Sequence, residues 1–238
     1  MKGKVYLVGA GPGDYKLLTL KGLECIKKAD VIVYDRLANK NYLKEAKENC
    51  EFIYVGKASS NHTLPQDDIN RVIADKAKEG KIVTRLKGGD PYVFGRGGEE
   101  GELLKEEGIE FEVVPGITSA IGGLCYAGIP ITHRDYASSF HVITGHLRDD
   151  DKENPEINWN ALANTNGTLV FLMGVANLQK ISSNLIKEGK SKDTPVALIS
   201  WATRSNQRVI TSTLENVYET AVRRSEEHTS ELQSPRTI

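Results

Sequence analysis

A glycine-rich loop and an acid stand where a nucleotide-binding site would need them. The segment Gly9-Ala10-Gly11-Pro12-Gly13-Asp14 follows the first β-type run and precedes a helical pattern. Asp35 ends the second β-type run, about 20 residues further on. This layout is close to a dinucleotide-binding fingerprint, in which glycines admit a pyrophosphate and an acid holds the ribose.

Two residues of the loop argue against a phosphate ligand. The third glycine of the fingerprint would fall at position 14, which is Asp14. A carboxylate there repels pyrophosphate at the helix start that should attract it. Pro12 also removes one backbone N–H donor from the loop. The loop therefore favours a nucleoside cofactor without phosphates, of which S-adenosylmethionine is one.

Other chemical motifs are incomplete in this chain. Gly56-Lys57 lacks the remaining residues of a P-loop, and His133, His141 and His146 do not have the spacing of a zinc-binding helix. A nucleophile elbow of the type G-x-S-x-G is missing from the sequence. We expect no metal.

Composition limits the function classes further. The chain has 238 residues, of which 39% are hydrophobic and 26% charged, and its net charge is −1. A balanced charge excludes the strong positive field of a nucleic-acid or anionic-membrane binder. The sequence has neither an apolar run of membrane length nor a signal-peptide pattern at its start. The three cysteines form no CxxC pair, so we expect a cytoplasmic protein with reduced thiols.

Alternating β-type and helical patterns in the first half predict a parallel α/β sheet. The expected strands are residues 5–8, 31–34, 52–55, 81–86 and 111–114, and the expected helices are residues 17–28, 41–48 and 66–78. Strands separated by helices favour right-handed parallel crossovers. Ligands of such sheets bind outside the carboxyl ends of the strands.

The second half predicts a mixed sheet. Its expected strands are residues 140–144, 168–173, 195–201 and 207–213, and the short link between the last two favours a hairpin. Half of the 22 glycines lie between Gly88 and Gly128, which indicates binding loops made of backbone, with ordinary turns as the alternative.

An ordered series of motifs then identifies a family. It comprises VGAGPGD at 8–14, YDRL at 34–37, VGK at 55–57, RLKGGDPYVFGRGGEE at 85–100, VPGITSA at 114–120, ITHR at 131–134 and MGV at 173–175. Across residues 2–223 the chain resembles the tetrapyrrole methylases. The sixteen-residue block most resembles members that act on uroporphyrinogen III.

The resemblance implies a fold, a cofactor and a reaction. The fold is α/β with two α/β domains, which we place at residues 1–116 and 117–223. A mainly parallel five-stranded sheet in the first and a mixed sheet in the second would hold S-adenosylmethionine in the cleft between them. The chain would act as a homodimer that methylates two pyrrole carbons of uroporphyrinogen III, giving precorrin-2 for sirohaem and cobalamin biosynthesis.

The resemblance also implies roles for individual residues. Asp35 would be the proton acceptor and Lys57 the proton donor. Cofactor contacts would fall on Pro12, Gly88, Gly89, Asp90, Val93, Thr118, Ser119, Met173 and Ala202. The alternative for Asp90 is that it only forms a turn.

The substrate carries eight carboxylates, which require local positive charge. Several bases lie at or just after predicted strand ends: Arg36, Lys57, Lys87, Arg96, His133, Arg134, His146 and Arg148. Arginine holds carboxylates in a bidentate geometry. We expect Arg36, Arg96 and Arg134 to bind the substrate, because their motifs also carry cofactor or catalytic positions.

The sequence departs from the family pattern in two places. Ala202-Thr203 replaces the usual Gly-Thr, which would strain the loop if φ were positive at Ala202. The polar segment 224–238 replaces the usual final helix and strand, so we exclude it from the fold as a non-native-looking tail. The second domain would then be truncated by one strand.

Three other functions stay open at this point. The chain could methylate a later corrin intermediate, could be a nucleotide-binding oxidoreductase or sensor, or could be a non-catalytic module that keeps the cofactor pocket. Asp14 argues against the second of these.

Overall fold

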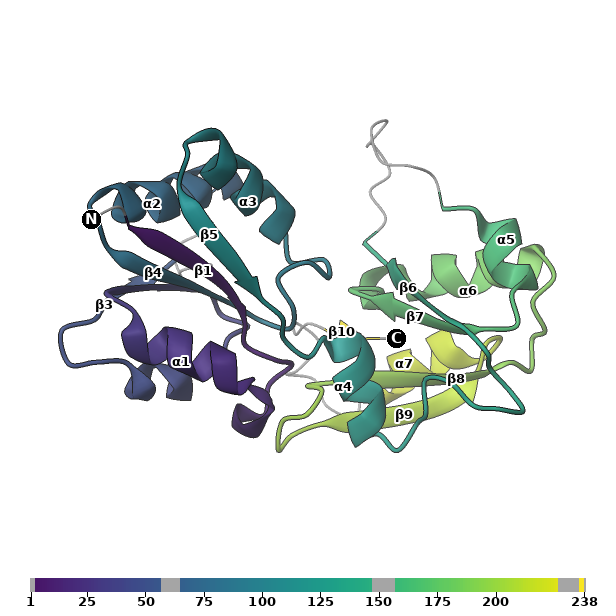
Figure 1. Ribbon diagram of the computed structural model, residues 1–238. Helices are drawn as coiled ribbons and strands as arrows, with labels where there is room; N and C mark the ends of the chain where they lie inside the picture. Colours follow the sequence, from purple (N-terminus) through teal and green to yellow (C-terminus); the bar gives the residue numbers. More distant parts are fainter. Residues whose placement is uncertain (1–2, 57–64, 147–156, 227–235, 238) are drawn as a thin grey trace. The chain divides into compact units, whose positions relative to one another are not determined.

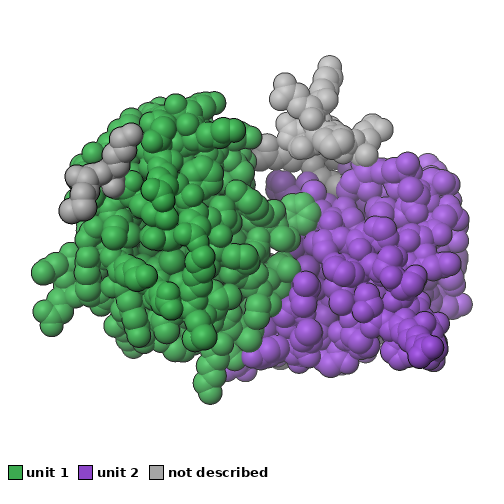
Figure 2. All heavy atoms as spheres, viewed as in Figure 1, with its two compact units in different colours: residues 1–119 green, residues 120–238 purple. Residues whose placement is uncertain are grey.

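The computed structural model describes residues 3–56, 65–146, 157–226 and 236–237. The chain divides into two compact units, unit 1 at residues 1–119 and unit 2 at residues 120–238 (Figure 2). Each unit contains one five-stranded sheet. None of the helices within the described ranges combines the length and the hydropathy that crossing a bilayer requires.

Unit 1 is built on a parallel sheet. Its strands are β1 (Lys4–Gly9), β2 (Val31–Tyr34), β3 (Glu51–Tyr54), β4 (Ile82–Lys87) and β5 (Glu110–Val114). They lie in the order β3-β2-β4-β1-β5, and every neighbouring pair is parallel (Figure 1). The predicted five-stranded parallel sheet is confirmed. Central β4 is buried along its last five residues.

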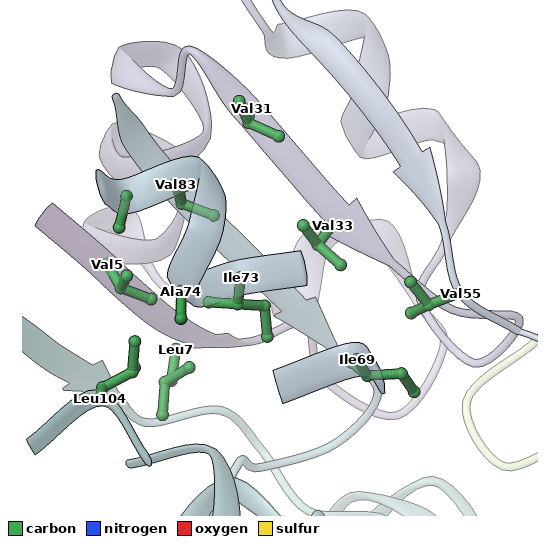
Figure 3. Packing of buried hydrophobic residues seen from close by; sticks show 11 residues of the cluster. Val5, Leu7, Val31, Val33, Val55, Ile69, Ile73, Ala74, Val83 and Leu104 are labelled. Atoms are coloured by element: carbon green, nitrogen blue, oxygen red, sulfur yellow. The ribbon is translucent and has the colours of Figure 1, made fainter. Parts of the chain in front are cut away.

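Each face of this sheet carries its own hydrophobic core. Helices α2 (Gln66–Lys78) and α3 (Gly97–Glu106) accompany one face, where Val5 and Leu7 of β1 pack with Ile73 and Leu104 (Figure 3). Because side chains alternate along a strand, Val8 points to the other face. There it packs with Ile26 of α1 (Leu20–Lys28). Each fully buried leucine or isoleucine contributes roughly 2 kcal/mol through its removal from water.

Local capping explains where two predicted helices differ from the structure. The helix expected at residues 17–28 begins only at Leu20, because the Thr19 side chain accepts a hydrogen bond from the Gly22 amide. The helix expected at residues 41–48 is the 3-10 helix Lys40–Glu45, which is capped by Asn39. Helix α2 has the bounds predicted for it.

Unit 2 contains the mixed sheet that the sequence predicts. Its strands are β6 (Phe140–Thr144), β7 (Thr168–Leu172), β8 (Pro195–Ser200), β9 (Arg208–Thr213) and β10 (Arg236–Thr237), in the order β6-β7-β10-β8-β9. β6 and β7 are parallel, whereas β8 and β9 form the expected antiparallel hairpin. Its helices are α4 (Ser119–Tyr126), whose first residue still belongs to unit 1, α5 (Trp159–Asn164), α6 (Leu178–Lys187) and α7 (Val217–Glu226).

The segment that we excluded from the fold contributes to two elements. Residues 224–226 end α7, and residues 236–237 form β10. β10 is antiparallel to both of its neighbours: Thr237 pairs with Leu172 of β7 and with Ile199 of β8. Within the described ranges, only these two residues lie between β7 and β8.

A cavity of about 530 Å³ lies in unit 2. Its walls include the parts of β7 and β8 beyond the short β10, together with α6. Apolar side chains dominate the lining, among them Leu169, Phe171, Leu178, Ile181, Leu185 and Val196.

Candidate active site

The loops that follow β1 and β4 are joined by their backbones. The Gly11 amide donates to the Gly89 carbonyl at 3.1 Å, and the Gly89 amide donates to the Gly11 carbonyl at 2.8 Å. The Ala10 amide donates to the Lys87 carbonyl at 2.7 Å. Gly11 and Gly89 have φ values of 74° and 68°, which glycine adopts without strain. Two predicted binding loops therefore meet at the carboxyl edge of the sheet.

Gly9 and Gly116 of unit 1 lie too close to neighbouring main chain for any side chain. A Cβ on Gly116 would lie 2.2 Å from the Gly89 carbonyl oxygen, and a Cβ on Gly9 would lie 2.5 Å from the Gly116 Cα. Gly88 is also constrained, since a Cβ there would lie 2.4 Å from the Leu37 Cβ. These contacts bring the loops after β1, β4 and β5 into one backbone-walled edge.

Gly89 leaves an open space beside Thr118. Within 4 Å, a Cβ on Gly89 would meet only the Thr118 Cα, at 3.9 Å, among the residues that the structure describes beyond its chain neighbours. Gly89 and Thr118 are both predicted cofactor contacts. An open space bordered by main chain suits a nucleoside, and the predicted contacts Val93 and Ser119 are half-buried in the same unit. The residues present therefore fit S-adenosylmethionine.

Asp90 holds two of these loops together. One carboxylate oxygen accepts a hydrogen bond from the Tyr92 amide at 2.8 Å, and the other accepts one from the Gly116 amide at 3.0 Å. The first bond is the turn that we considered as the alternative for Asp90. The second ties the loop after β4 to the loop after β5. The side chain therefore shapes the glycine edge.

The first loop is closed to a phosphate by its own residues. The Asp14 carboxylate accepts a hydrogen bond from the Lys16 amide and caps the 3-10 helix Tyr15–Leu17. An anion at this helix start is thus already supplied by the protein. Pro12, the predicted cofactor contact of this loop, is half-buried. The geometry supports the sequence argument for a cofactor without phosphates.

Tyr42 supports the first loop from beneath. Its buried hydroxyl lies 3.1–3.2 Å from the carbonyl oxygens of Ala10, Asp14 and Tyr15. Burial, followed by the charge of Asp14, raises the pKa of Tyr42 to about 12, so the hydroxyl remains a donor. The Asn39 side-chain amide donates to the Gly13 carbonyl at 3.0 Å. These partners hold the loop in one conformation.

In unit 2, three residues that are not glycine adopt left-handed backbone after strand ends. Met173 follows β7 with φ 61°, while Trp201 and Thr203 follow β8 with φ 53° and 65°. Such conformations cost on the order of 1–2 kcal/mol for a residue with a Cβ. Strain of this kind gathers at functional sites. Met173 is 46% exposed, so it can contact a ligand.

Ala202 lies between two of the strained residues without sharing their conformation. Its φ is not positive, so the replacement of the family's glycine does not strain the loop. Ala202 is buried, and a Cβ on Gly123 would lie 3.1 Å from its Cβ. The Gln207 side chain accepts a hydrogen bond from the Thr203 amide at 2.6 Å and holds the turn.

The sequence matches the Tetrapyrrole (Corrin/Porphyrin) Methylases over residues 4–218. This chain belongs to the tetrapyrrole methylases. The resemblance that its motifs carry is therefore confirmed.

Two curated members of the family are close in sequence. A uroporphyrinogen-III C-methyltransferase of Priestia megaterium is 55% identical over 215 residues, which are 90% of this chain and 90% of that protein. An S-adenosyl-L-methionine-dependent uroporphyrinogen III methyltransferase of Methanosarcina barkeri is 56% identical over 215 residues, which are 90% of this chain and 84% of that protein.

A solved structure of the family shares the fold. The uroporphyrin-III C-methyl transferase of Thermus thermophilus, complexed with S-adenyl homocysteine, matches with a TM-score of 0.78 at 35% identity. The match covers 98% of this chain and 91% of that chain.

Asp35 of this tetrapyrrole methylase is a partly exposed carboxylate that is held at both oxygens. One oxygen accepts a hydrogen bond from the Leu37 amide at 2.9 Å, and the other accepts one from the Arg85 guanidinium at 3.1 Å. Its side chain is 22% exposed. Lys57, the predicted proton donor, lies outside the described residues.

The predicted substrate-binding arginines differ in their surroundings. Arg36 and Arg134 are exposed. Arg96 has a left-handed φ of 57° at the start of α3, and its guanidinium donates to both oxygens of Glu99, at 2.8 and 2.5 Å. Its charge therefore already has a partner. His133 and His146 are exposed, and Arg148 lies outside the described residues.

A buried charge cluster is the feature that sequence reasoning missed in this tetrapyrrole methylase. Arg85, Lys87 and Glu100 are buried inside unit 1. Lys87, which we counted among the bases for substrate carboxylates, instead donates to the buried Glu100 carboxylate at 2.7 Å. The signal was present, since two cations at alternate positions of a central strand must find a counter-charge when the strand is buried. Within the described ranges, no group of three or more His, Cys, Asp or Glu side chains could hold a metal ion.

Proposed function

We propose that this chain is an S-adenosylmethionine-dependent methyltransferase that methylates two pyrrole carbons of uroporphyrinogen III and gives precorrin-2. The observation that carries the proposal is the identity of 55% and 56% to relatives named for this methylation, along nearly their whole length. Precorrin-2 leads to sirohaem and cobalamin.

S-adenosylmethionine supplies a methyl group on a sulfonium, which is already activated for transfer to carbon. The protein's task is then to hold the cofactor and the macrocycle in line and to exclude water. Orientation of this kind can lower a barrier by roughly 7–11 kcal/mol. The glycine edge of unit 1 is suited to this task because its loops are fixed by backbone bonds and by Asp90.

The proposed cofactor contacts are those of the family motifs. In unit 1 they are Pro12, Gly88, Gly89, Asp90, Val93, Thr118 and Ser119, and in unit 2 they are Met173 and Ala202. The open space at Gly89 and the exposed, left-handed Met173 support this assignment. Asp90 contributes mainly by shaping the loops.

Asp35 is proposed to accept the proton that leaves the macrocycle after methylation, and Lys57 to donate one. The Asp35 carboxylate is partly exposed and is held at both oxygens. Its orientation is therefore defined, as a general base requires. Asp35→Asn is expected to lower turnover by on the order of 100-fold or more, as the loss of a general base does.

Arg36, Arg96 and Arg134 are proposed to bind the substrate carboxylates. A guanidinium offers planar donors that match a carboxylate. Arg96 must share its donors with Glu99 or release that residue when the substrate binds. Glu99 therefore influences how strongly Arg96 binds a substrate carboxylate.

We also propose that the chain works in the cytoplasm as a homodimer. The location is supported by three free cysteines, two of which are buried, as expected of a protein from a reducing compartment. Sedimentation equilibrium of the purified chain tests the dimer, and a single species of 26.2 kDa would refute it.

In the decisive assay, the chain is incubated with uroporphyrinogen III and S-adenosylmethionine, and the mass of the product is measured by mass spectrometry. A product in which two methyl groups have replaced two hydrogens is expected. Methylation of a later corrin intermediate instead, with uroporphyrinogen III untouched, would move the chain to another step of the family. Unchanged turnover of Asp35→Asn and Lys57→Met would refute the proton-transfer roles and leave the methyltransferase intact.

A further inference from the structure

The carboxyl end of β4 carries two charged side chains at buried positions. Arg85 and Lys87 stand two residues apart, so they point to the same face of the sheet. That face is the one on which Val83 of the same strand packs in the hydrophobic core. The side chains of Arg85 and Lys87 are each 4% exposed. Charges in such a place are costly unless they are paired.

Glu100 of α3 is the counter-charge of both cations. Its side chain is fully buried. One carboxylate oxygen lies 3.1 Å from the Arg85 Nε and 2.7 Å from the Lys87 Nζ, and the Gln66 side-chain amide lies 3.4 Å away. The second oxygen has no hydrogen-bond partner within the described ranges. Glu100 thus anchors two side chains of β4 through a single oxygen.

Arg85 uses three of its donors in three directions. Nε donates to Glu100, Nη1 donates to the Leu86 carbonyl at 3.2 Å, and Nη2 donates to Asp35 at 3.1 Å. A planar guanidinium fixed at Glu100 and at the main chain has little freedom to rotate. Its third contact therefore presents a donor to Asp35 in a fixed place.

We propose that Arg85 is a positioning residue for the proton transfer at Asp35, and that the buried Glu100 fixes Arg85 in the orientation this requires. The inference deepens the proposed function and rests on the role of Asp35 there. Glu100, Arg85 and Asp35 form a chain that runs from the buried interior to a partly exposed carboxylate.

The two cations of the cluster have different tasks. Lys87 forms an ion pair with Glu100, whereas the ion pair to Asp35 comes from Arg85. Burial, and then the charge of Arg85, lowers the pKa of Lys87. Arginine keeps its charge at every working pH, so it is the suitable cation beside a carboxylate that must remain oriented. Lys87 serves to hold Glu100.

Stability alone is a weak reason to bury this cluster. Replacement of buried ion pairs by apolar side chains is often neutral or stabilising, because desolvation offsets the attraction. A role in catalysis explains the buried charges better, because the contacts that begin at Glu100 end at Asp35, the proposed proton acceptor.

Arg85→Lys is the first variant. Lysine keeps the buried positive charge, but its single ammonium cannot hold Glu100, the Leu86 carbonyl and Asp35 together. We expect kcat to fall by about 10- to 100-fold, as a small misplacement of a catalytic group does. The KM for uroporphyrinogen III and the affinity for S-adenosylhomocysteine are expected to change by less than about threefold.

Arg71→Lys is the matched control. Arg71 of α2 pairs with Glu107 near the end of α3, and its side chain is 54% exposed. It makes the same kind of ion pair in the same unit without reaching Asp35. Its kcat is expected to stay at the level of the unaltered chain.

A double-mutant cycle with Asp35→Asn separates positioning from structure. If Arg85 acts through Asp35, then Arg85→Lys lowers kcat in the unaltered chain and has no further effect in Asp35→Asn. The same fold-loss in both backgrounds would overturn the proposal, because a structural defect does not depend on Asp35.

Glu100→Gln provides a second entry to the cycle if Arg85→Lys does not fold. Glutamine keeps an acceptor for Arg85 and Lys87 and removes only the charge. It is expected to lower kcat by a smaller factor that likewise disappears in Asp35→Asn, and a loss that persists there would overturn the proposal.

The proposed function and this inference fail in different ways. Full turnover of Asp35→Asn alone would refute the role of Asp35. Loss of turnover in Asp35→Asn, together with normal kcat in both Arg85→Lys and Glu100→Gln, would refute only the positioning chain.

Discussion

Unit 1 and unit 2 build the carboxyl edges of their sheets by different means. In unit 1, the turns after β1 and β4 use the left-handed glycines Gly11 and Gly89. Gly9 and Gly116 there lie against neighbouring main chain with no room for a Cβ. In unit 2, the residues directly after β7 and β8 are the left-handed Met173 and Trp201. One edge is made of main chain, whereas the other presents side chains from strained backbone.

The two edges differ in what each can offer a ligand. Glycines permit a close approach of backbone to a ligand, at an entropic cost in the unfolded chain. Strained residues such as Met173 hold a side chain in a direction that relaxed backbone would not give. The contact of Gly145 with Gly174 shows that unit 2 also uses glycine where two backbones meet, since a Cβ on Gly145 would lie 2.3 Å from the Gly174 Cα.

The interiors of the two units differ as well. The faces of the unit 1 sheet are packed with fully buried side chains such as Leu7, Ile73 and Ile26. Unit 2 contains the cavity of about 530 Å³, which is lined by apolar side chains of β7, β8 and α6. A residue that lines a void has fewer contacts to lose on truncation.

The largest expected effect compares these interiors. Leu7→Ala in unit 1 is expected to lower the free energy of unfolding by about 4 kcal/mol, because it opens a new hole in a filled core. Leu185→Ala in unit 2 is expected to cost about 2 kcal/mol, because Leu185 already faces the cavity. Urea unfolding of both variants measures the difference. Equal losses would show that the cavity does not relax the packing of unit 2.

The next effect tests the glycine edge. Gly116→Ala is expected to cost about 3 kcal/mol and to weaken S-adenosylhomocysteine binding, because its Cβ would meet the Gly89 carbonyl oxygen at 2.2 Å. Gly98→Ala is the control, since a Cβ there meets nothing within 4 Å. Thermal unfolding and calorimetry measure the two effects. Normal binding by Gly116→Ala would show that the close backbone contacts at Gly116 are not needed to bind the cofactor.

The strained edge of unit 2 predicts a trade-off. Met173→Gly relieves left-handed strain and is expected to raise stability by about 0.5 kcal/mol, after the entropic cost of glycine. Affinity for S-adenosylhomocysteine is expected to fall in the same variant, because the side chain that the strain presents is lost. If stability rose while affinity stayed the same, Met173 would have no role in binding.

The smallest effect concerns pH. The pKa of Asp30 in unit 1 is lowered by its bond to Lys47 and then by the Ile82 amide. A carboxyl with a lowered folded pKa adds stability above its unfolded pKa of 3.8 and loses it as pH falls through the folded value. The midpoint of unfolding is expected to fall less steeply at acid pH in Asp30→Asn than in the unaltered chain. An unchanged acid limb would show that Asp30 contributes nothing there.

Unit 2 has a pH dependence of the same sign at one residue, but in the alkaline range. Burial lowers the pKa of Lys190, whose ammonium donates to the Ala163 and Thr165 carbonyls. The unfolded chain then binds more protons at this group, so its contribution to stability rises as pH increases toward the ordinary lysine value. Lys190→Met is expected to reduce that rise in the alkaline limb.

Local patterns were sufficient for much of the fold. The run Val31–Tyr34 and the helix Gln66–Lys78 have the predicted bounds, because continuous apolar residues and a helical apolar face are local signals. Helix α3 had no such signal, since three of its ten residues are glycine. Its position depends on packing against α2 and on the buried Glu100, which are tertiary contacts.

The site was predictable where it depends on motifs and hidden where it depends on geometry. The motif residues and the phosphate-hostile Asp14 could be named from the sequence. The left-handed φ of Met173 and the two hydrogen bonds that the Asp90 carboxylate accepts could not, because neither residue type implies them. The Glu100–Arg85–Asp35 chain joins residues up to 65 positions apart, and no local pattern connects them.

Isothermal titration calorimetry tests the central claim most directly. The claim is that the backbone loops of unit 1 disfavour a phosphate ligand and bind a nucleoside that carries a sulfonium. The account predicts that the full chain binds S-adenosylhomocysteine at one site per chain, that Gly89→Val weakens this binding, and that NAD(P) does not bind. Binding of NAD(P) with no heat from S-adenosylhomocysteine would contradict it.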